Sequence, residues 1–152
     1  MAMTNKLRDI SKLYLDTNIF IYFLEGEPHI AKLVERVFQV CGEFDIAVVT
    51  SEITVIECMI RPHKQHNKAM IDKYQSFFDG AQDVISILPI NSSLVQKIPL
   101  VAARFNLKLV DSLHVATAIS DGCDGFLSND HGIGPFDNSM TSLILSDNIL
   151  AA

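Results

Sequence analysis

Apolar residues occur along the chain in two patterns, short unbroken runs and longer stretches at helical spacing. The runs predict buried strands at 12–15, 46–49, 84–88 and 125–128, and an edge strand at 142–145. Helical spacing and capping residues predict helices at 19–24, 30–41, 52–60, 64–78, 92–105 and 111–120. We expect Pro62 to end the helix that begins at residue 52, because proline lacks a backbone donor.

Strands that alternate with helices in this way indicate βαβ units and a mainly parallel sheet covered by helices on both faces. The predicted fold class is therefore α/β. The chain contains neither a recognisable linker nor an internal repeat, so we expect a single domain over residues 1–152. In such sheets, ligands bind beyond the carboxyl ends of the strands, and polar residues at that edge are the first candidates for a site.

The composition is typical of a globular protein from a reducing compartment. Apolar residues make up 49% and charged residues 20% of the 152 positions, the reverse of a disordered chain. The three cysteines contain no C-x-x-C pair and are expected to be free thiols. Residues 1–12 lack the apolar segment of a signal peptide, and the longest apolar run is far shorter than the ~20 residues of a membrane span. We expect a cytoplasmic protein with no membrane segment.

The formal net charge of −6 argues mildly against a partner bound by bulk electrostatics, since nucleic-acid-binding proteins usually carry a basic surface. One locally basic stretch extends from Arg61 to Lys73. Its Arg61, Lys64 and Lys68 are candidates for contact with nucleic-acid phosphates. An ordinary solvated helix face explains the same residues equally well.

Four carboxylates occupy places where a site would form on this fold. Asp16 and Asp130 follow the first and fourth predicted strands, and Asp111 begins a predicted helix. Helix capping explains Asp16 and Asp111 without any chemistry, and a turn explains Asp130. The fourth acid, Glu57, is more informative. The isoleucines at 53, 56 and 60 predict the buried face of its helix, and Glu57 falls on that face.

Isolated buried charge is expensive, so a carboxylate at position 57 must be paired, hydrogen-bonded or bound to a metal. A buried ion pair is as good an explanation as a metal for this acid alone. Together, however, the four acids converge on one edge of a doubly wound sheet, where they would repel one another unless a cation neutralised them. Oxygen ligands without a nearby Cys or His pair indicate Mg²⁺ or Mn²⁺. Such a site suits phosphodiester hydrolysis.

Four segments resemble the motifs of the PIN-domain nucleases, and in particular of the VapC-type toxins of prokaryotic toxin–antitoxin pairs. In chain order they are LYLDTNIF at 13–20, SEITVIE at 51–57, FNLKLVDSLHVATA at 105–118 and DGFLSND at 124–130. The third motif is the most specific, and the four occur in the order of the family. Two features depart from its pattern: Ser128 stands where Thr is more usual, and the glycine-rich stretch 131–136 is slightly longer.

This resemblance implies a three-layer α/β/α sandwich, cleavage of RNA that depends on Mg²⁺ or Mn²⁺, a homodimer and a cognate antitoxin. The catalytic and metal-binding residues that it implies are Asp16, Glu57, Asp111 and Asp130. The polar residues expected to support these acids by hydrogen bonds are Thr17, Asn18, Ser51 and Asn129. His114 lies one helical turn after Asp111 and is a candidate for contact with the acids or with an RNA phosphate. A histidine in such a place is more often a satisfied core residue.

Several alternatives to a toxin remain at this point. A housekeeping PIN-type nuclease of RNA processing would carry the same motifs without an antitoxin. A regulatory module could keep the fold and the metal pocket without cleaving RNA, although the complete set of acids argues against it. A haloacid-dehalogenase-type phosphatase needs a second Asp two residues after the first, where this chain has Asn18. A receiver domain needs paired acids and a later lysine, and it fits equally poorly.

Overall fold

The computed structural model describes residues 6–146 and 149. Residues 1–5, part of the segment expected to lack a signal peptide, lie outside the described residues. Within them, one sheet has the strand order β3-β2-β1-β4-β5, and every neighbouring pair is parallel. The strands are β1 (Lys12–Leu15), β2 (Ala47–Ser51), β3 (Ile85–Leu88), β4 (Gly125–Ser128) and β5 (Thr141–Ile144). They lie within a few residues of the predicted positions, and β5 is at an edge as expected.

The helices are α1 (Thr17–Glu25), α2 (Pro28–Glu43), α3 (Glu52–Lys64), α4 (Lys68–Ala81), α5 (Ser92–Phe105) and α6 (Leu109–Ser120). The prediction that Pro62 ends α3 is wrong, because the helix continues through it to Lys64. Pro62 is buried in this helix, and its packing offsets the one backbone hydrogen bond that a proline removes. The chain turns only at 65–67, where the Asn67 side chain accepts from the Met70 backbone N–H and starts α4.

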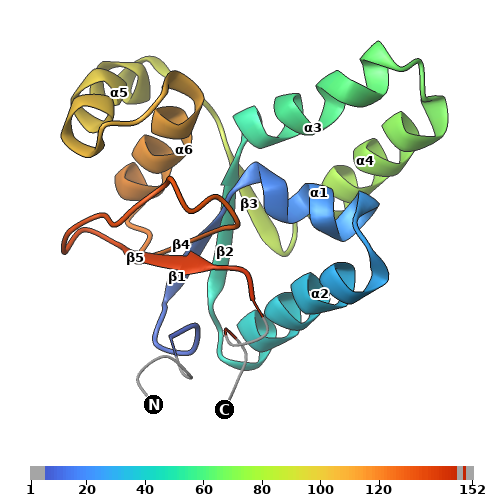
Figure 1. The fold of residues 1–152 in the computed structure, drawn as a ribbon, viewed down its shortest axis with the longest axis horizontal. Helices are drawn as coiled ribbons and strands as arrows, with labels where there is room; N and C mark the ends of the chain where they lie inside the picture. Colours follow the sequence, from blue (N-terminus) through green and yellow to red (C-terminus); the bar gives the residue numbers. More distant parts are fainter. Residues whose placement is uncertain (1–5, 147–148, 150–152) are drawn as a thin grey trace.

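Side chains alternate across the strands and build a core on each face of the sheet. Leu13 and Leu15 of β1 belong to a cluster covered by α1, α2, α3 and α4. Tyr14, between them, belongs to a second cluster covered by α5 and α6. Figure 1 shows the two groups of helices on opposite sides of the sheet. The predicted three-layer α/β/α sandwich is thereby confirmed.

The order of the strands places two connections side by side at the carboxyl edge of the sheet. The chain moves outward from β1 to β2 and β3, and then returns to place β4 on the other side of β1. The Asp16 N–H donates to the Leu127 carbonyl, which continues the pairing of β1 with β4 to the last residue. Helix α1 starts directly after β1, and α3 starts directly after β2. Polar residues at these starts are therefore neighbours.

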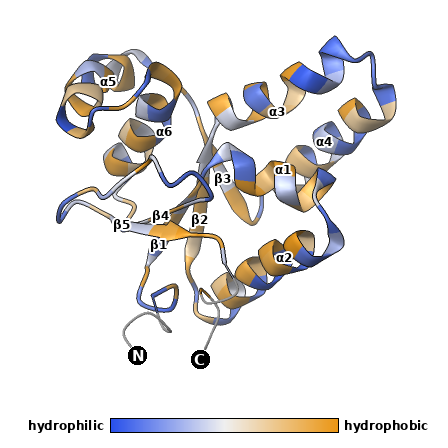
Figure 2. Ribbon diagram, in the orientation of Figure 1, coloured by the Kyte–Doolittle hydropathy of each residue, from blue (hydrophilic) through white to orange (hydrophobic). Residues whose placement is uncertain are grey.

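The basic segment and the cysteines lie where the sequence predicts them. Figure 2 shows a hydrophilic stretch where α3 turns into α4, which is the locally basic segment of the sequence. The three cysteines are free and buried. None of the helices in the described part of the chain is both long and apolar enough to cross a membrane.

Candidate active site

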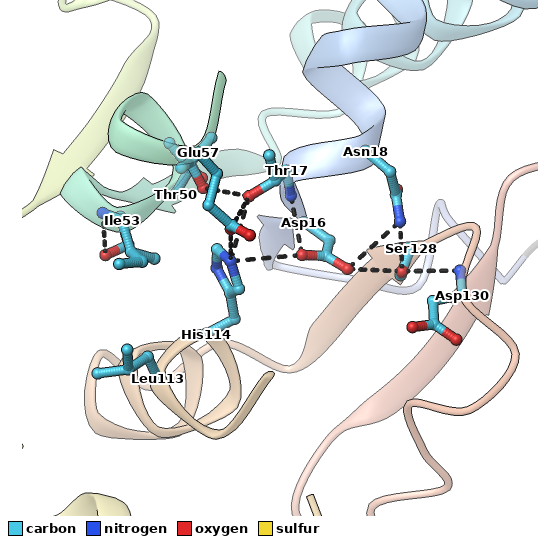
Figure 3. Close-up of polar contacts among 12 residues, drawn as sticks. Asp16, Thr17, Asn18, Thr50, Ile53, Glu57, Leu113, His114, Ser128 and Asp130 are labelled. Atoms are coloured by element: carbon cyan, nitrogen blue, oxygen red, sulfur yellow. Dashed lines mark hydrogen bonds and ion pairs between the residues drawn. The ribbon is translucent and has the colours of Figure 1, made fainter. Parts of the chain in front are cut away.

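Asp16 is buried at the end of β1, and hydrogen bonds fix both of its carboxylate oxygens. It caps α1, with Oδ1 accepting from the Thr17 N–H at 2.8 Å. The Ser128 hydroxyl donates to Oδ2 at 2.7 Å, and the Asn18 amide lies 3.5 Å from the same oxygen. Figure 3 shows Ser128 between Asp16 and Asp130. The capping role expected of Asp16 is confirmed, and the capping hydrogen bond orients the carboxylate toward the other acids.

Glu57 lies on α3 and is bound through a single oxygen. Its Oε1 accepts from the Thr17 hydroxyl at 2.6 Å and from His114 Nε2 at 2.7 Å (Figure 3). Burial opposes ionisation, but these two hydrogen bonds outweigh it and hold the pKa of Glu57 below its usual range. The carboxylate is therefore ionised and oriented.

The predicted buried face of α3 is wrong. Ile56 is 52% exposed and Ile60 is 47% exposed, while the buried positions of the helix are Thr54, Cys58 and Pro62. The polar residue Thr54 can be buried on this face because its hydroxyl is paired with that of Thr50 at 2.7 Å. The helix is rotated so that Glu57 is half-buried beside the acids and the exposed isoleucines flank the site.

Asp111 lies in the first turn of α6 and does not cap it. The helix begins at Leu109 with Lys108 at the capping position, two residues earlier than predicted. Burial and the negative charges of Asp16 and Asp130 raise the pKa of Asp111, and Glu57 adds a smaller effect of the same sign. Asp111 is therefore close enough to each of the other three acids to interact with it electrostatically. The convergence expected from the sheet topology is present.

Asp130 is exposed and forms the turn that follows β4. Its Oδ1 accepts from the Gly132 N–H at 2.8 Å, and its own N–H donates to the Ser128 hydroxyl at 3.0 Å. The turn explanation for Asp130 is thus correct as structure. The same hydrogen bonds hold the carboxylate at the rim of the acidic cluster, at the start of the glycine-rich stretch.

The polar residues expected to support the acids divide into two groups. Thr17 and Asn18 contact them directly, as described above. Ser51 acts at one remove, because its hydroxyl accepts from the Ile53 N–H and caps the helix that carries Glu57. Asn129 donates from its backbone to Asn18 and from its side chain to the Tyr22 hydroxyl, so it contacts neither Asp16 nor Asp130 through its side chain.

Two residues with central hydrogen bonds, Ser128 and Tyr14, were absent from the sequence-based set. Ser128 could have been found as the hydroxyl residue of the fourth motif. His114 was expected to contact the acids or an RNA phosphate, and the contact with the acids is present, because its Nε2 is bonded to Glu57. Contact with RNA is not possible for this side chain, which is 1% exposed and is also bonded to Tyr14. Arg61, Lys64 and Lys68 are exposed on the α3–α4 hairpin, and Lys68 pairs with Asp72 at 3.1 Å.

The side chains fit a hard divalent cation by their chemistry. Carboxylate oxygens are the ligands that Mg²⁺ and Mn²⁺ prefer, and the raised pKa of Asp111 reports repulsion that a cation would relieve. As they stand, no three His, Cys, Asp or Glu side chains in the described residues lie close enough together to hold a metal ion. The donors are gathered at one edge, and they are not closed into a coordination shell.

Comparison with known proteins identifies the class. A parallel α/β/α sandwich with acids at the carboxyl edge of its sheet is shared with a group of nucleases, and the PIN-domain family model matches residues 13–137. The chain belongs to the PIN-domain family. No curated protein matches the chain by sequence.

Solved structures of toxin–antitoxin proteins share the fold. One is VapBC2 from Rickettsia felis bound to a promoter DNA fragment, with 14% identity, a TM-score of 0.63, and coverage of 89% of this chain and 99% of that chain. A toxin–antitoxin complex from Klebsiella pneumoniae is 19% identical over 85% and 95% of the two chains, with a TM-score of 0.63. DNA-bound VapBC from Salmonella typhimurium is 14% identical over 89% and 98%, with a TM-score of 0.65.

Proposed function

We propose that this single-domain protein is a metal-dependent endoribonuclease and the toxin of a toxin–antitoxin pair. The observation that carries the proposal is the cluster itself: carboxylates from four distant segments of a PIN domain meet at one edge of the sheet, where Asp111 interacts with each of the other three. Asp111 does not cap α6, so the helix does not need a carboxylate at this position. A structural role therefore does not explain why Asp111 lies among three like charges. Such an arrangement persists where a function needs it.

Asp16 and Asp111 are the proposed ligands of Mg²⁺ or Mn²⁺, with Glu57 binding the same ion or its water. When bound, the ion supplies positive charge for the scissile phosphate and lowers the pKa of a water molecule. The chain itself contributes orientation: the Thr17 N–H and Ser128 fix Asp16, and Thr17 and His114 fix Glu57. Asp130, exposed at the rim, is proposed to hold a second ion or to orient the attacking water.

RNA as the substrate is supported by the family and by the position of the exposed basic residues. Arg61, Lys64 and Lys68 lie on the same α3–α4 hairpin as Glu57 and could offset part of the net negative charge along a bound strand. Action in the cytoplasm is part of the same proposal.

An antitoxin partner is supported by the solved relatives and by the surface around the acids. Proteins that share this fold were solved as toxin–antitoxin complexes. In this chain, Ile56 and Ile60 on one flank of the cluster and Leu109 and Val110 on the other are exposed. Apolar side chains beside an acidic site suit a protein partner that covers it. A homodimer, which the resemblance implies, belongs to the same proposal.

The test is cleavage of a mixed RNA pool in the presence of Mg²⁺, Mn²⁺ or EDTA. Wild type should make discrete, metal-dependent cuts, and Asp16→Asn should reduce them by at least ~10³-fold, because an essential charged ligand is lost. Asp79→Asn makes the same change in charge at an exposed acid on α4 and should cleave like wild type. An Asp16→Asn protein with full activity would overturn the assignment of the site.

The alternatives predict other results from the same assay. A folded wild type that binds Mn²⁺ and cuts no RNA would favour the non-cleaving module. If a small open reading frame lies immediately upstream, cleavage that continues unchanged in the presence of its protein product would favour a housekeeping nuclease. Inhibition of cleavage by that protein would support the toxin.

A further inference from the structure

We propose that His114 is a positioning residue that holds Glu57 in its working orientation, and that Tyr14 in turn holds the ring of His114. This inference rests on the proposed nuclease function. His114 is on α6 and Tyr14 is on β1, whereas Glu57 is on α3, so the three side chains connect elements from both sides of the sheet. Figure 3 shows His114 directed from α6 at Glu57.

The chemistry of the partner fixes the direction of the hydrogen bond between His114 and Glu57. An ionised carboxylate only accepts, so His114 Nε2 must carry the proton that it shares with Glu57 Oε1 at 2.7 Å. The other ring nitrogen, Nδ1, lies 2.6 Å from the Tyr14 hydroxyl and shares a hydrogen bond with it. Burial and the charge of Asp16 raise the pKa of Tyr14, so this hydroxyl keeps its proton.

Tyr14 is a rigid anchor for the histidine ring. It is fully buried in the central strand of the sheet, with Val49 and Phe126 as its register partners on the two sides. Its ring stacks on Phe126 with the centroids 5.1 Å apart and the planes within 9° of each other. A hydroxyl held in this way cannot follow a moving side chain, so the position of Nδ1 is set by the sheet.

As a consequence, the two oxygens of Glu57 have different roles in the site. His114 and Thr17 both bind Oε1, which leaves Oε2 as the oxygen available to a cation or a water molecule. Nε2 also lies 3.6 Å from Asp16 Oδ1, so the ring stands between two of the acids. His114 itself is buried and cannot reach a substrate, which makes it a positioning residue and not a catalytic one.

The experiment measures Mn²⁺ affinity by calorimetry, and kcat and KM for RNA cleavage, in four variants. His114→Ala should weaken Mn²⁺ binding by roughly 10–100-fold and lower kcat with little change in KM, as loss of a ligand's supporting partner does. His114→Gln can place an amide N–H where Nε2 was and should recover most of the affinity. Tyr14→Phe keeps the stacked ring, removes the hydroxyl, and should cause a smaller loss of the same kind.

Tyr74→Phe is the matched control. Tyr74 is as buried as Tyr14, and its hydroxyl donates to Glu25 at the end of α1, outside the acidic cluster. It should lose its hydrogen bond without any change in Mn²⁺ affinity. A direct readout without metal is the ¹⁵N spectrum of His114, where we expect the proton on Nε2 in wild type.

The possible failures are distinguishable. Folded His114→Ala and Tyr14→Phe proteins with wild-type Mn²⁺ affinity and kcat would overturn the positioning role and leave the nuclease standing. A ring that carries no proton on Nε2 would overturn it as well. A wild-type protein that neither binds Mn²⁺ nor cleaves RNA would overturn the proposed function and, with it, this inference.

Discussion

At the scale of single residues, Glu57 and Asp111 show how the protein distributes its hydrogen bonds over the acids. The two carboxylates have opposite pKa shifts in the same cluster. Thr17 and His114 donate to Glu57, and burial is outweighed there, whereas burial and like charges dominate at Asp111. Within the described residues no hydrogen-bond donor is directed at the Asp111 carboxylate. A bound cation should therefore stabilise the ionised form of Asp111 more than that of the other acids.

Asp111→Asn should stabilise the metal-free protein at neutral pH. Because the folded-state pKa of Asp111 is raised, folding is opposed by its ionised form, and this cost is present at pH values above the folded-state pKa. We expect the melting temperature to rise by about 1–3 °C at pH 7. The difference should disappear below about pH 3, where Asp111 is protonated in both the folded and the unfolded states. Thermal unfolding followed by circular dichroism, with EDTA present, measures both points. A lower melting temperature at pH 7 would contradict the argument.

At the scale of the elements, local signals predicted where helices begin better than which face they bury. Asp16 and Ser51 cap α1 and α3 as expected, because a capping hydrogen bond involves only neighbours in the sequence. The stripe of isoleucines on α3 gave the wrong face, because burial of Thr54 depends on its pairing with Thr50 of β2, which no local pattern contains. The continuation through Pro62 has the same kind of tertiary cause.

The cap of α3 should matter for activity as well as for stability. Ser51→Ala removes the acceptor for the Ile53 N–H, and should destabilise the fold by about 1 kcal/mol and lower the melting temperature by about 2–4 °C. Because the same helix carries Glu57, we also expect cleavage to fall. Asn91 caps α5 by accepting from the Leu94 N–H, and α5 carries none of the acids. Asn91→Ala should cause a similar loss of stability and leave the activity per folded molecule unchanged; equal losses of activity in both would argue against a specific role of this cap.

At the scale of the whole molecule, the strand order explains which acids meet and why the sequence could predict that much. The carboxyl ends of β1 and β4 are neighbours in the sheet, so Asp16 and Asp130 come together although 113 other residues lie between them. Topology places residues at an edge, but it does not say which side chains bridge the layers. The sequence suggested that His114 could contact the acids, but it did not predict its bond to Tyr14, because that contact depends on how α6 packs on the sheet.

A cation held jointly by Asp16, Glu57 and Asp111, which come from distant parts of the chain, should stabilise the whole fold. A saturating concentration of Mn²⁺, about 100 times the dissociation constant, adds roughly 2.7 kcal/mol to the free energy of unfolding, and we expect a rise in melting temperature of about 5 °C or more. EDTA should reverse it. The Asp111→Asn protein, with a ligand lost, should show a much smaller rise, and an equal rise in both proteins would place the metal elsewhere. Differential scanning calorimetry with and without Mn²⁺ measures the effect.

The turn between α3 and α4 divides the acidic cluster in a useful way. Asp16 and Glu57 precede it in the chain, and Asp111 and Asp130 follow it. If the backbone were opened at this exposed hairpin, each fragment would contain two of the four acids and only part of the parallel sheet. Neither fragment could then cleave RNA on its own. If the two fragments were fused to two other proteins, nuclease activity would appear only when those two proteins associate, and it would report their association.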